Sequence, residues 1–443
     1  LFVICITFLK ILSAKTSLIC LIKYRCYFWR LYRTYMKNET LINIAKDYKT
    51  PVYVYNGNKI KNQFQRLKNA FNKVDNLSIK YACKALSNIS ILSLIRSFGS
   101  GLDTVSIQEV HLGIKAGFNP EDIIFTPNGV SLEEIESVAS MGVQINIDNL
   151  STLEQFGSKH PNTPVCIRIN PHVMAGGNSN ISVGHIDSKF GISIHQIPHI
   201  LRIVENTQMQ INGVHMHTGS DILDIEVFLH AAEILFETAL KFKNLEFIDF
   251  GSGFKVPYKP GDIETNIEEL GEKLSQRFKL FCKTYGKELK LTFEPGKFLV
   301  SEAGYFLTKV NAVKQTTSTV FAQVDSGFNH LIRPMMYGSH HEIVNISNTK
   351  GKERFYTVVG YICETDTFGS NRKIAEISEG DILAFRNAGA YCFTMASNYN
   401  SRFRPPEVLW YEEEAHLIRK EETFEDLTQN QILIEFSETA TIN

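Results

Sequence analysis

The sequence has none of the features that mark several common protein classes. Its eight cysteines form no C-x-x-C pair and are too sparse for a secreted disulfide scaffold, which indicates reduced thiols in a cytoplasmic protein. Lysine and arginine number 46 and aspartate and glutamate 47, so the net charge of −1 favours neither nucleic acid nor anionic lipid as a partner. Repeats, low-complexity tracts and long charge runs are missing as well.

The composition is that of an ordinary globular protein. Apolar residues make up 44% and charged residues 21% of the chain, which excludes a disordered chain, a coiled coil and a collagen-like repeat. At about 150 residues per domain, a chain of 443 residues predicts two or three domains.

The first 35 residues differ from the rest. They contain six lysines or arginines, no acidic residue and three of the eight cysteines. The apolar run from Leu1 to Leu12 is interrupted by Lys10 and is shorter than the roughly 20 residues of a membrane span. No longer apolar run follows, and Met36 opens a polar helix start. We therefore expect residues 1–35 to be an upstream translated stretch rather than a signal peptide or an anchor, with no membrane contact.

Eight short apolar runs alternate with helical patterns from residue 79 onward. Hydroxyl-x-x-Glu sequences, typical of helix starts, lie between several of them: Ser106 to Glu109, Ser131 to Glu134 and Ser151 to Glu154. This alternation predicts parallel βα units, and the count favours a closed (βα)8 barrel over an open doubly wound sheet. The runs are Ile79–Cys83, Leu102–Val105, Ile123–Phe125, Val143–Ile147, Val165–Ile169, Ile211–Met216, Leu245–Phe250 and Leu289–Phe293.

A second, mainly β domain is predicted after the barrel, where turn residues separate strand-like runs and helical patterns become rare. We expect residues 36–55 to pair with this domain, residues 56–298 to form the barrel and residues 299–443 to form the β domain. The predicted strands are Tyr305–Val313, Thr319–Val324, Phe355–Gly360, Ile382–Phe385 and Ile432–Phe436, with Pro51–Tyr55 before the barrel.

Polar residues and glycines follow most of the eight runs. In a (βα)8 barrel the carboxyl ends of the strands form one mouth, where catalytic groups sit. The joint placement therefore predicts an active site there. The residues are Lys84, Asp103, Asp148, Arg168-Ile169-Asn170, His217, Gly251-Ser252-Gly253 and Glu294-Pro295-Gly296-Lys297.

Four of these features match the needs of pyridoxal phosphate. A desolvated Lys84 can form a Schiff base with a carbonyl, and bare backbone N–H groups at Gly251–Gly253 suit a phosphate. Glu294 suits a protonated pyridine nitrogen, and His217 suits the face of a ring. His215 and His217 alternate on one strand and would also suit a metal, but no third ligand lies at useful spacing, so we expect none.

A set of separate motifs runs in order from about Ala45 to about Leu409. They are Tyr81-Ala82-Cys83-Lys84-Ala85, Ser188-Lys189-Phe190-Gly191, His215-Met216-His217-Thr218-Gly219-Ser220, Gly251-Ser252-Gly253, Glu294-Pro295-Gly296-Lys297, Arg333-Pro334-Met335-Met336-Tyr337, Ile362-Cys363-Glu364-Thr365-Asp366 and Gly389-Ala390-Tyr391 with Tyr399-Asn400. Together they resemble the group IV pyridoxal-phosphate decarboxylases of the alanine-racemase-like fold, and among these the diaminopimelate decarboxylases.

The resemblance implies pyridoxal 5'-phosphate as the cofactor. Lys84 would carry it covalently, His217 would stack on its ring, Ser220 and the Gly251–Gly253 loop would hold its phosphate, and Glu294 would pair with the ring nitrogen. Arg168 would lie near its phenolic oxygen. The full implied cofactor set is Lys84, Arg168, His217, Ser220, Gly251, Ser252, Gly253, Glu294, Gly296, Lys297 and Tyr391.

The resemblance also implies the reaction, which is decarboxylation of meso-2,6-diaminopimelate to L-lysine and CO2. The active sites would be shared in a head-to-tail homodimer, in which Cys363 of the partner protonates the carbanion and Glu364 binds the distal amine. A bidentate Arg333 would hold the distal carboxylate. The implied substrate-binding residues are Lys297, Arg333, Tyr337, Glu364 and Tyr391.

Two departures from the family pattern stand out. Lys297 replaces the usual arginine, which keeps the charge but loses the planar fork, and Ser252 replaces the middle glycine of the phosphate loop. Rival interpretations are an ornithine, arginine or carboxynorspermidine decarboxylase, of which the last is the hardest to exclude, and a non-catalytic homologue without cofactor. Glu294, where a racemase would have arginine, disfavours an amino-acid racemase.

Overall fold

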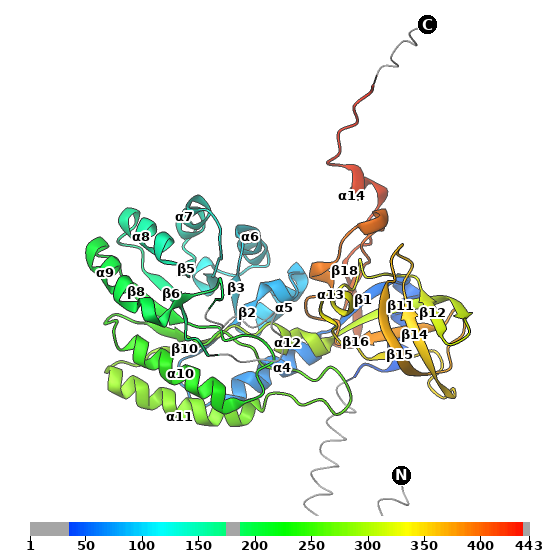
Figure 1. The fold of residues 1–443 in the computed structure, drawn as a ribbon, viewed down its shortest axis with the longest axis horizontal. Coiled ribbons are helices and arrows are strands. Elements are labelled where there is room, and N and C mark those ends of the chain that lie inside the picture. Colours follow the sequence, from blue (N-terminus) through cyan, green and yellow to red (C-terminus); the bar gives the residue numbers. More distant parts are fainter. Residues whose placement is uncertain (1–34, 174–186, 437–443) are drawn as a thin grey trace, which may run out of the picture.

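The computed structural model describes residues 35–173 and 187–436. Two bodies lie side by side, a barrel ringed by helices and a mainly β domain (Figure 1). The predicted fold class, a (βα)8 barrel with a mainly β domain, is confirmed. The prediction for residues 1–35 falls almost wholly outside the described residues. Within the described ranges, no helix is both long and apolar enough to span a bilayer.

All eight predicted barrel strands are present. They pair in parallel in the order β5-β4-β3-β2-β10-β9-β8-β6, and pairing of β5 with β6 closes the barrel. A short strand, β7 (Ile192–Ser193), pairs with β6. The barrel strands are β2 (Leu77–Ala82), β3 (Gly101–Thr104), β4 (Ile123–Phe125), β5 (Gln144–Ile147), β6 (Val165–Asn170), β8 (Ile211–His215), β9 (Phe247–Asp249) and β10 (Lys290–Phe293).

Helices cover the outside of this barrel (Figure 1). Two predicted helix starts hold, because Ser106 and Ser131 accept from the backbone N–H groups of Glu109 and Glu134. The third predicted start was wrong. The helix is capped two residues earlier than Ser151, by Asn149, whose side chain accepts from Thr152 N. The helices are α4 (Gly57–Ala70), α5 (Ile89–Ser97), α6 (Ile107–Lys115), α7 (Leu132–Ser140), α8 (Leu150–Lys159), α9 (Ile197–Thr207), α10 (Ile225–Ala239) and α11 (Ile267–Tyr285).

The β domain is built on one branched sheet. Its main path runs β15-β14-β12-β11-β1-β17-β18, and β16 pairs with both β11 and β13. The strands are β1 (Val52–Asn56), β11 (Gly304–Gln315), β12 (Val320–Val324), β13 (Ile343–Asn345), β14 (Glu353–Val359), β15 (Thr367–Ala375), β16 (Ile382–Arg386), β17 (Glu407–Tyr411) and β18 (Glu414–Arg419), with short helices α3 (Asn38–Tyr48), α12 (Lys297–Val300), α13 (Arg333–Tyr337) and α14 (Phe424–Thr428).

The N-terminal strand β1 lies between two strands from much later in the sequence. It pairs antiparallel with β11 and parallel with β17, and its residues Val52–Tyr55 are fully buried. Tyr53 stacks on Phe306 of β11 with ring centroids 4.5 Å apart. The first strand of the described chain is therefore a central strand of the β domain.

The predicted strand Ile432–Phe436 was wrong. These residues adopt no regular structure and pair with no described strand. They extend beyond α14, away from the sheet (Figure 1), and Ile432 is 90% exposed. An apolar run forms a strand only where a partner satisfies its backbone groups, and no described strand pairs with this one.

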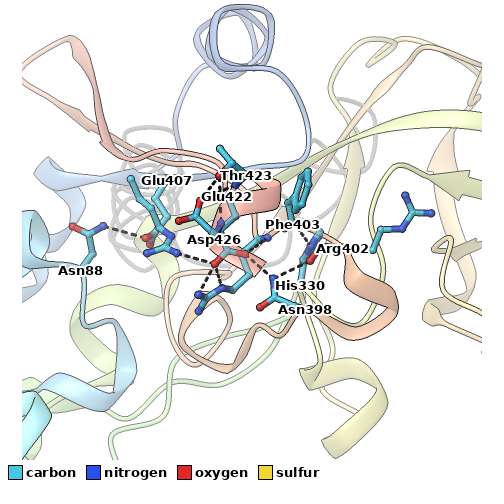
Figure 2. Close-up of polar contacts among 11 residues, drawn as sticks. Asn88, His330, Asn398, Arg402, Phe403, Glu407, Glu422, Thr423 and Asp426 are labelled. Carbon is cyan, nitrogen blue, oxygen red and sulfur yellow. Dashed lines mark hydrogen bonds and ion pairs between the residues drawn. The ribbon is translucent and has the colours of Figure 1, made fainter. Parts of the chain in front are cut away.

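Before it reaches α14, the chain is fastened to the β domain through a buried carboxylate (Figure 2). Glu422 accepts from Asn398 Nδ2 at 2.6 Å and from the backbone N–H of Arg404 at 2.8 Å. The guanidinium groups of Arg404 and Arg419 also contact it. Burial raises the pKa of Glu422, but these contacts outweigh burial and lower the pKa to about 2.

Replacing Glu422 with glutamine should destabilise the protein in a pH-dependent way. The folded pKa lies below the unfolded value of about 4.3, so the stabilisation is complete above that pH and is lost as the pH falls towards 2. We expect Glu422→Gln to lower the free energy of unfolding by about 1–3 kcal/mol near neutral pH, and by less at about pH 3.

Denaturant unfolding at both pH values measures this effect. Glu421→Gln, a change at the exposed neighbouring glutamate, serves as the matched control and should leave stability unchanged. A loss at Glu422→Gln that is equally large at both pH values would contradict the assignment.

Candidate active site

A cavity of about 650 Å³ opens at the mouth of the barrel and is closed on one side by the β domain. That size suits a small organic ligand. Twelve of the fifteen site residues proposed from sequence line it: Lys84, Arg168, His217, Ser220, Ser252, Gly253, Glu294, Gly296, Lys297, Arg333, Tyr337 and Tyr391.

Lys84 lies on the single 3-10 turn that follows β2, and its amine is next to a carboxylate of β3. Lys84 Nζ is 3.7 Å from Asp103 Oδ2, and the Asp103 side chain is only 2% exposed. Burial lowers the pKa of Lys84, but the charge of Asp103, with smaller contributions from Tyr391 and Glu294, outweighs burial and raises it. The amine is therefore held as an ammonium until a ligand displaces this pair.

Glu294 follows β10 and is bound to the histidine that ends β8. His215 Nε2 lies 3.1 Å from Glu294 Oε2, and Asp249 from β9 completes a group whose ligand atoms lie within 4.8 Å of one another. Burial raises the pKa of Glu294, but its contacts with His215 and the charge of Lys84 lower it to about 2. Burial also lowers the pKa of His215, which favours a neutral imidazole that donates to an ionised Glu294.

The glycine loop after β9 packs tightly against His217. Ser252 N donates to His217 Nδ1 at 3.3 Å, so the ring hydrogen lies on Nε2. A Cβ at Gly251 would lie 2.7 Å from the same Nδ1, and one at Gly253 would overlap Gly219 O. Burial, helped by the charge of Arg168, lowers the pKa of His217 far below its usual value, and a neutral ring suits stacking.

The β domain supplies the opposite wall. Tyr391 N donates to Ala85 O at 2.8 Å, one residue after Lys84, and the Tyr391 side chain lines the cavity. Arg333, on α13, places its guanidinium 5.8 Å from the Tyr391 ring and 5.7 Å from the Tyr337 ring. The cavity thus exists only where the two domains meet.

Lys297 has a carboxylate partner of its own. Its Nζ lies 2.8 Å from Asp221 Oδ1, and both side chains line the cavity. Lys297 and Arg333 lie about equally far from the Tyr258 ring, at 6.0 and 5.9 Å. Two cations and one internal carboxylate therefore meet at this end of the cavity.

Three residues proposed from sequence lie outside the cavity lining. Gly251 supports the loop from behind and donates to Asp249 Oδ1 at 2.8 Å. Cys363 and Glu364 lie in an exposed loop of the β domain. In a single chain they are thus separate from the group around Lys84.

The residues present fit pyridoxal phosphate. Among the described residues, several buried polar atoms of the cavity have no hydrogen-bond partner within the chain, including Asp103 Oδ1, Glu294 Oε1 and Arg333 Nε. Buried polar groups are normally paired, so these atoms are available to a polar ligand. The tight glycine loop allows close approach of a phosphate, and Lys84 provides the amine.

Sequence analysis placed Asp103 and Glu294 at the barrel mouth but gave Asp103 no role. It did not single out Asp249 or Asp221. The sequence could have indicated Asp249 as a site residue, because a charged residue at the end of a buried strand needs a nearby partner. No third metal ligand lies at useful sequence spacing from His215 and His217, but the fold brings Asp249 and Glu294 close to His215.

Gly253→Ala should weaken cofactor binding. The added Cβ would overlap Gly219 O, and φ at residue 253 is +117°, so the loop that faces the cavity must shift. We expect pyridoxal phosphate to bind about tenfold more weakly, as measured by equilibrium dialysis. Gly261→Ala is the control, since φ is +78° there and no atom lies within 4 Å of the added Cβ. Equal affinity in the two variants would exclude this loop as the phosphate site.

Comparison with known proteins agrees with this geometry. Residues 57–301 match the family described as pyridoxal-dependent decarboxylase, pyridoxal binding domain. Diaminopimelate decarboxylase of Methanothermobacter thermautotrophicus is 38% identical over 88% of this chain and 93% of its own length. That of Escherichia coli K12 is 34% identical over 89% of this chain and 97% of its own length.

A solved structure gives the same result. Diaminopimelate decarboxylase from Helicobacter pylori, in complex with L-lysine, superposes with a TM-score of 0.78 at 32% identity and covers 91% of this chain and 98% of its own. The cavity at the mouth of the barrel, the lysine that lines it and these relatives together show that the chain belongs to the diaminopimelate decarboxylase family of pyridoxal-dependent decarboxylases.

Proposed function

We propose that this chain removes CO2 from meso-2,6-diaminopimelate to give L-lysine, with pyridoxal 5'-phosphate bound at Lys84. One observation carries the proposal. A single cavity contains a lysine and an ionised glutamate at the barrel mouth and a half-buried arginine from the β domain. The first two suit a pyridine aldehyde, and the arginine suits a substrate that has a second carboxylate.

Lys84 must lose a proton before its amine can act as a nucleophile. Asp103 Oδ2 is the nearest acceptor, at 3.7 Å. Burial, and then the charge of Glu294, raise the pKa of Asp103, so this carboxylate accepts a proton more readily than an exposed one. Asp103 is in this way the base that frees the amine.

Bound pyridoxal phosphate supplies an electron-accepting ring that stabilises the charge left at Cα when CO2 departs. Glu294, kept ionised by His215, would hold a proton on the ring nitrogen. His217 would cover one face of the ring, and Ser220 with Ser252 and Gly253 would hold the phosphate. Arg168, which lies over the Phe190 ring at 4.9 Å, would face the phenolic oxygen.

The distal carboxylate of the substrate would bind at Arg333, whose buried Nε has no partner within the described chain. Tyr337 and Tyr391 flank this guanidinium. Lys297 would add a second positive charge, and Asp221 forms an ion pair with it. This end of the cavity therefore favours a substrate with a distal carboxylate. A substrate that decarboxylates to a plain diamine has no carboxylate at that end.

We also propose a head-to-tail homodimer that completes each site with Cys363 and Glu364 of the partner. Their exposure and their place outside the cavity lining support this arrangement. We further propose residues 36–55 as a segment of the β domain, 56–298 as the cofactor-binding barrel and 299–443 as the β domain. Five free cysteines among the described residues support a cytoplasmic location.

Incubation with meso-diaminopimelate tests the function. We expect equimolar CO2 and lysine, and a loss of at least ~10³-fold in turnover for Lys84→Ala. Lys80→Ala, which removes a lysine of β2, the strand just before Lys84, outside the cavity lining, should stay active. Release of CO2 from ornithine or carboxynorspermidine but not from diaminopimelate would overturn the substrate assignment.

Mixing two inactive variants tests the shared site. Lys84→Ala and Cys363→Ala subunits each lack one half of the proposed machinery, so a heterodimer regains one complete site of two. Random reassembly should restore roughly a quarter of wild-type activity, because half of the dimers are mixed. No recovery in a heterodimer verified by native mass spectrometry would mean that each site is built within one chain.

A further inference from the structure

The loop that carries Cys363 is closed by a buried aspartate. Asp366 accepts from Ile362 N at 2.9 Å and from Phe328 N at 2.6 Å, and its side chain is almost fully buried. The turn therefore has a defined shape, with Cys363 and Glu364 exposed at its tip.

A second loop, residues 398–404, is anchored by hydrogen bonds near both of its ends (Figure 2). Asn398 Nδ2 donates to Arg402 O at 3.0 Å and to the buried Glu422 at 2.6 Å. Phe403 O contacts His330 Nε2 at 2.9 Å. The loop is held at both ends and presents its middle residues outward.

Three residues of the second loop, Tyr399, Asn400 and Arg402, contact the Cys363 loop or its surroundings. Tyr399 stacks on Phe328 and donates to Glu364 Oε1 at 3.2 Å. The Arg402 guanidinium lies 4.0 Å from the centre of the Tyr361 ring. Between these contacts, Asn400 touches Cys363 twice.

The two contacts of Asn400 fix the orientation of its amide. Cys363 N donates to Asn400 Oδ1 at 3.3 Å, and Asn400 Nδ2 lies 3.2 Å from Cys363 Sγ. A backbone N–H can only donate, so the oxygen must face it and the NH2 group must face the sulfur. Sγ therefore accepts from Asn400, and the thiol hydrogen stays free to point elsewhere.

We propose that Asn400 is a positioning residue for Cys363, which holds the sulfur at the loop tip and stabilises the thiolate left when the thiol gives up its proton. The inference rests on the proposed role of Cys363. In that step the S–H bond breaks, the substrate carbon gains the proton in place of CO2, and the thiolate later takes a proton from water. The N–H of Asn400 faces the sulfur throughout.

Two variants of Asn400 distinguish its hydrogen bond with the Cys363 backbone from its contact with the Cys363 sulfur. Asn400→Asp keeps the acceptor for Cys363 N but places an oxygen against the sulfur. Asn400→Gly removes the side chain and suits the left-handed backbone, since φ is +55° at this residue. Asn371→Asp is the matched control, because Asn371 is also exposed, has a φ of +51° and lies on β15.

The measurement is the rate at which Cys363 reacts with iodoacetamide as a function of pH, followed by mass spectrometry of the Cys363 peptide in the holoenzyme. Tyr399 also contacts this thiol and donates to Glu364, and both residues are unchanged in every variant. We expect the pH midpoint to rise by about one unit in Asn400→Asp and by less in Asn400→Gly, with no shift in Asn371→Asp. The turnover number should fall about tenfold in Asn400→Asp with the KM changed less than about twofold.

Two results would overturn the proposal. An unchanged pH midpoint in both Asn400 variants would mean that the amide does not act on the sulfur. A raised midpoint with unchanged turnover would mean that the thiol is held by Asn400 but is not the proton donor. The second result also removes Cys363 from the proposed mechanism, while CO2 release and binding of the cofactor at Lys84 would stand.

Discussion

Three buried carboxylates in the barrel mouth set the chemistry of the whole site. Asp103, Asp249 and Glu294 are each less than a tenth exposed, and an unpaired buried charge is costly. The fold offsets them with Lys84 beside Asp103 and His215 beside Glu294. Contacts with His215 and the charge of Lys84 lower the pKa of Glu294, so Glu294 keeps its charge. Burial and the Glu294 charge raise the pKa of Asp249, so Asp249 is easier to protonate.

This balance depends on the contact between domains. Tyr391 reaches the mouth only because its backbone is bonded to Ala85, next to the lysine. The close approach of Gly304 and Gly389, where a Cβ on either glycine would overlap backbone atoms, keeps the start of β11 against the loop before Tyr391. The N-terminal strand β1, held between β11 and β17, adds to the same interface. A site built this way exists only after both domains have folded and docked.

The barrel could be predicted from sequence because each strand is a buried apolar run with polar residues at its carboxyl end. The regular alternation predicted eight parallel units, and Lys84, Glu294 and the glycine loop were located from their place after those runs. The resemblance to a known family added Cys363, Glu364 and Arg333, which no local pattern would have identified.

Other features depended on distant contacts that the local sequence does not contain. The Asp221 contact with Lys297 spans 76 residues, and His215 meets Glu294 across 79. Ile432–Phe436 has the composition of a strand but pairs with no strand in the described part of the chain. Asn149, rather than Ser151, caps α8. Both side chains can cap a helix, and only the backbone geometry decides between them. Strands β13, β15, β17 and β18 were not predicted.

The central claim is that the Lys84 amine is the group that binds the cofactor. Borohydride reduction of the protein after addition of pyridoxal phosphate, followed by peptide mapping, tests it most directly. The account predicts one phosphopyridoxyl group per chain, located on Lys84, with loss of the visible absorbance. A protein that stays colourless and unmodified, or a label on another lysine, would contradict it.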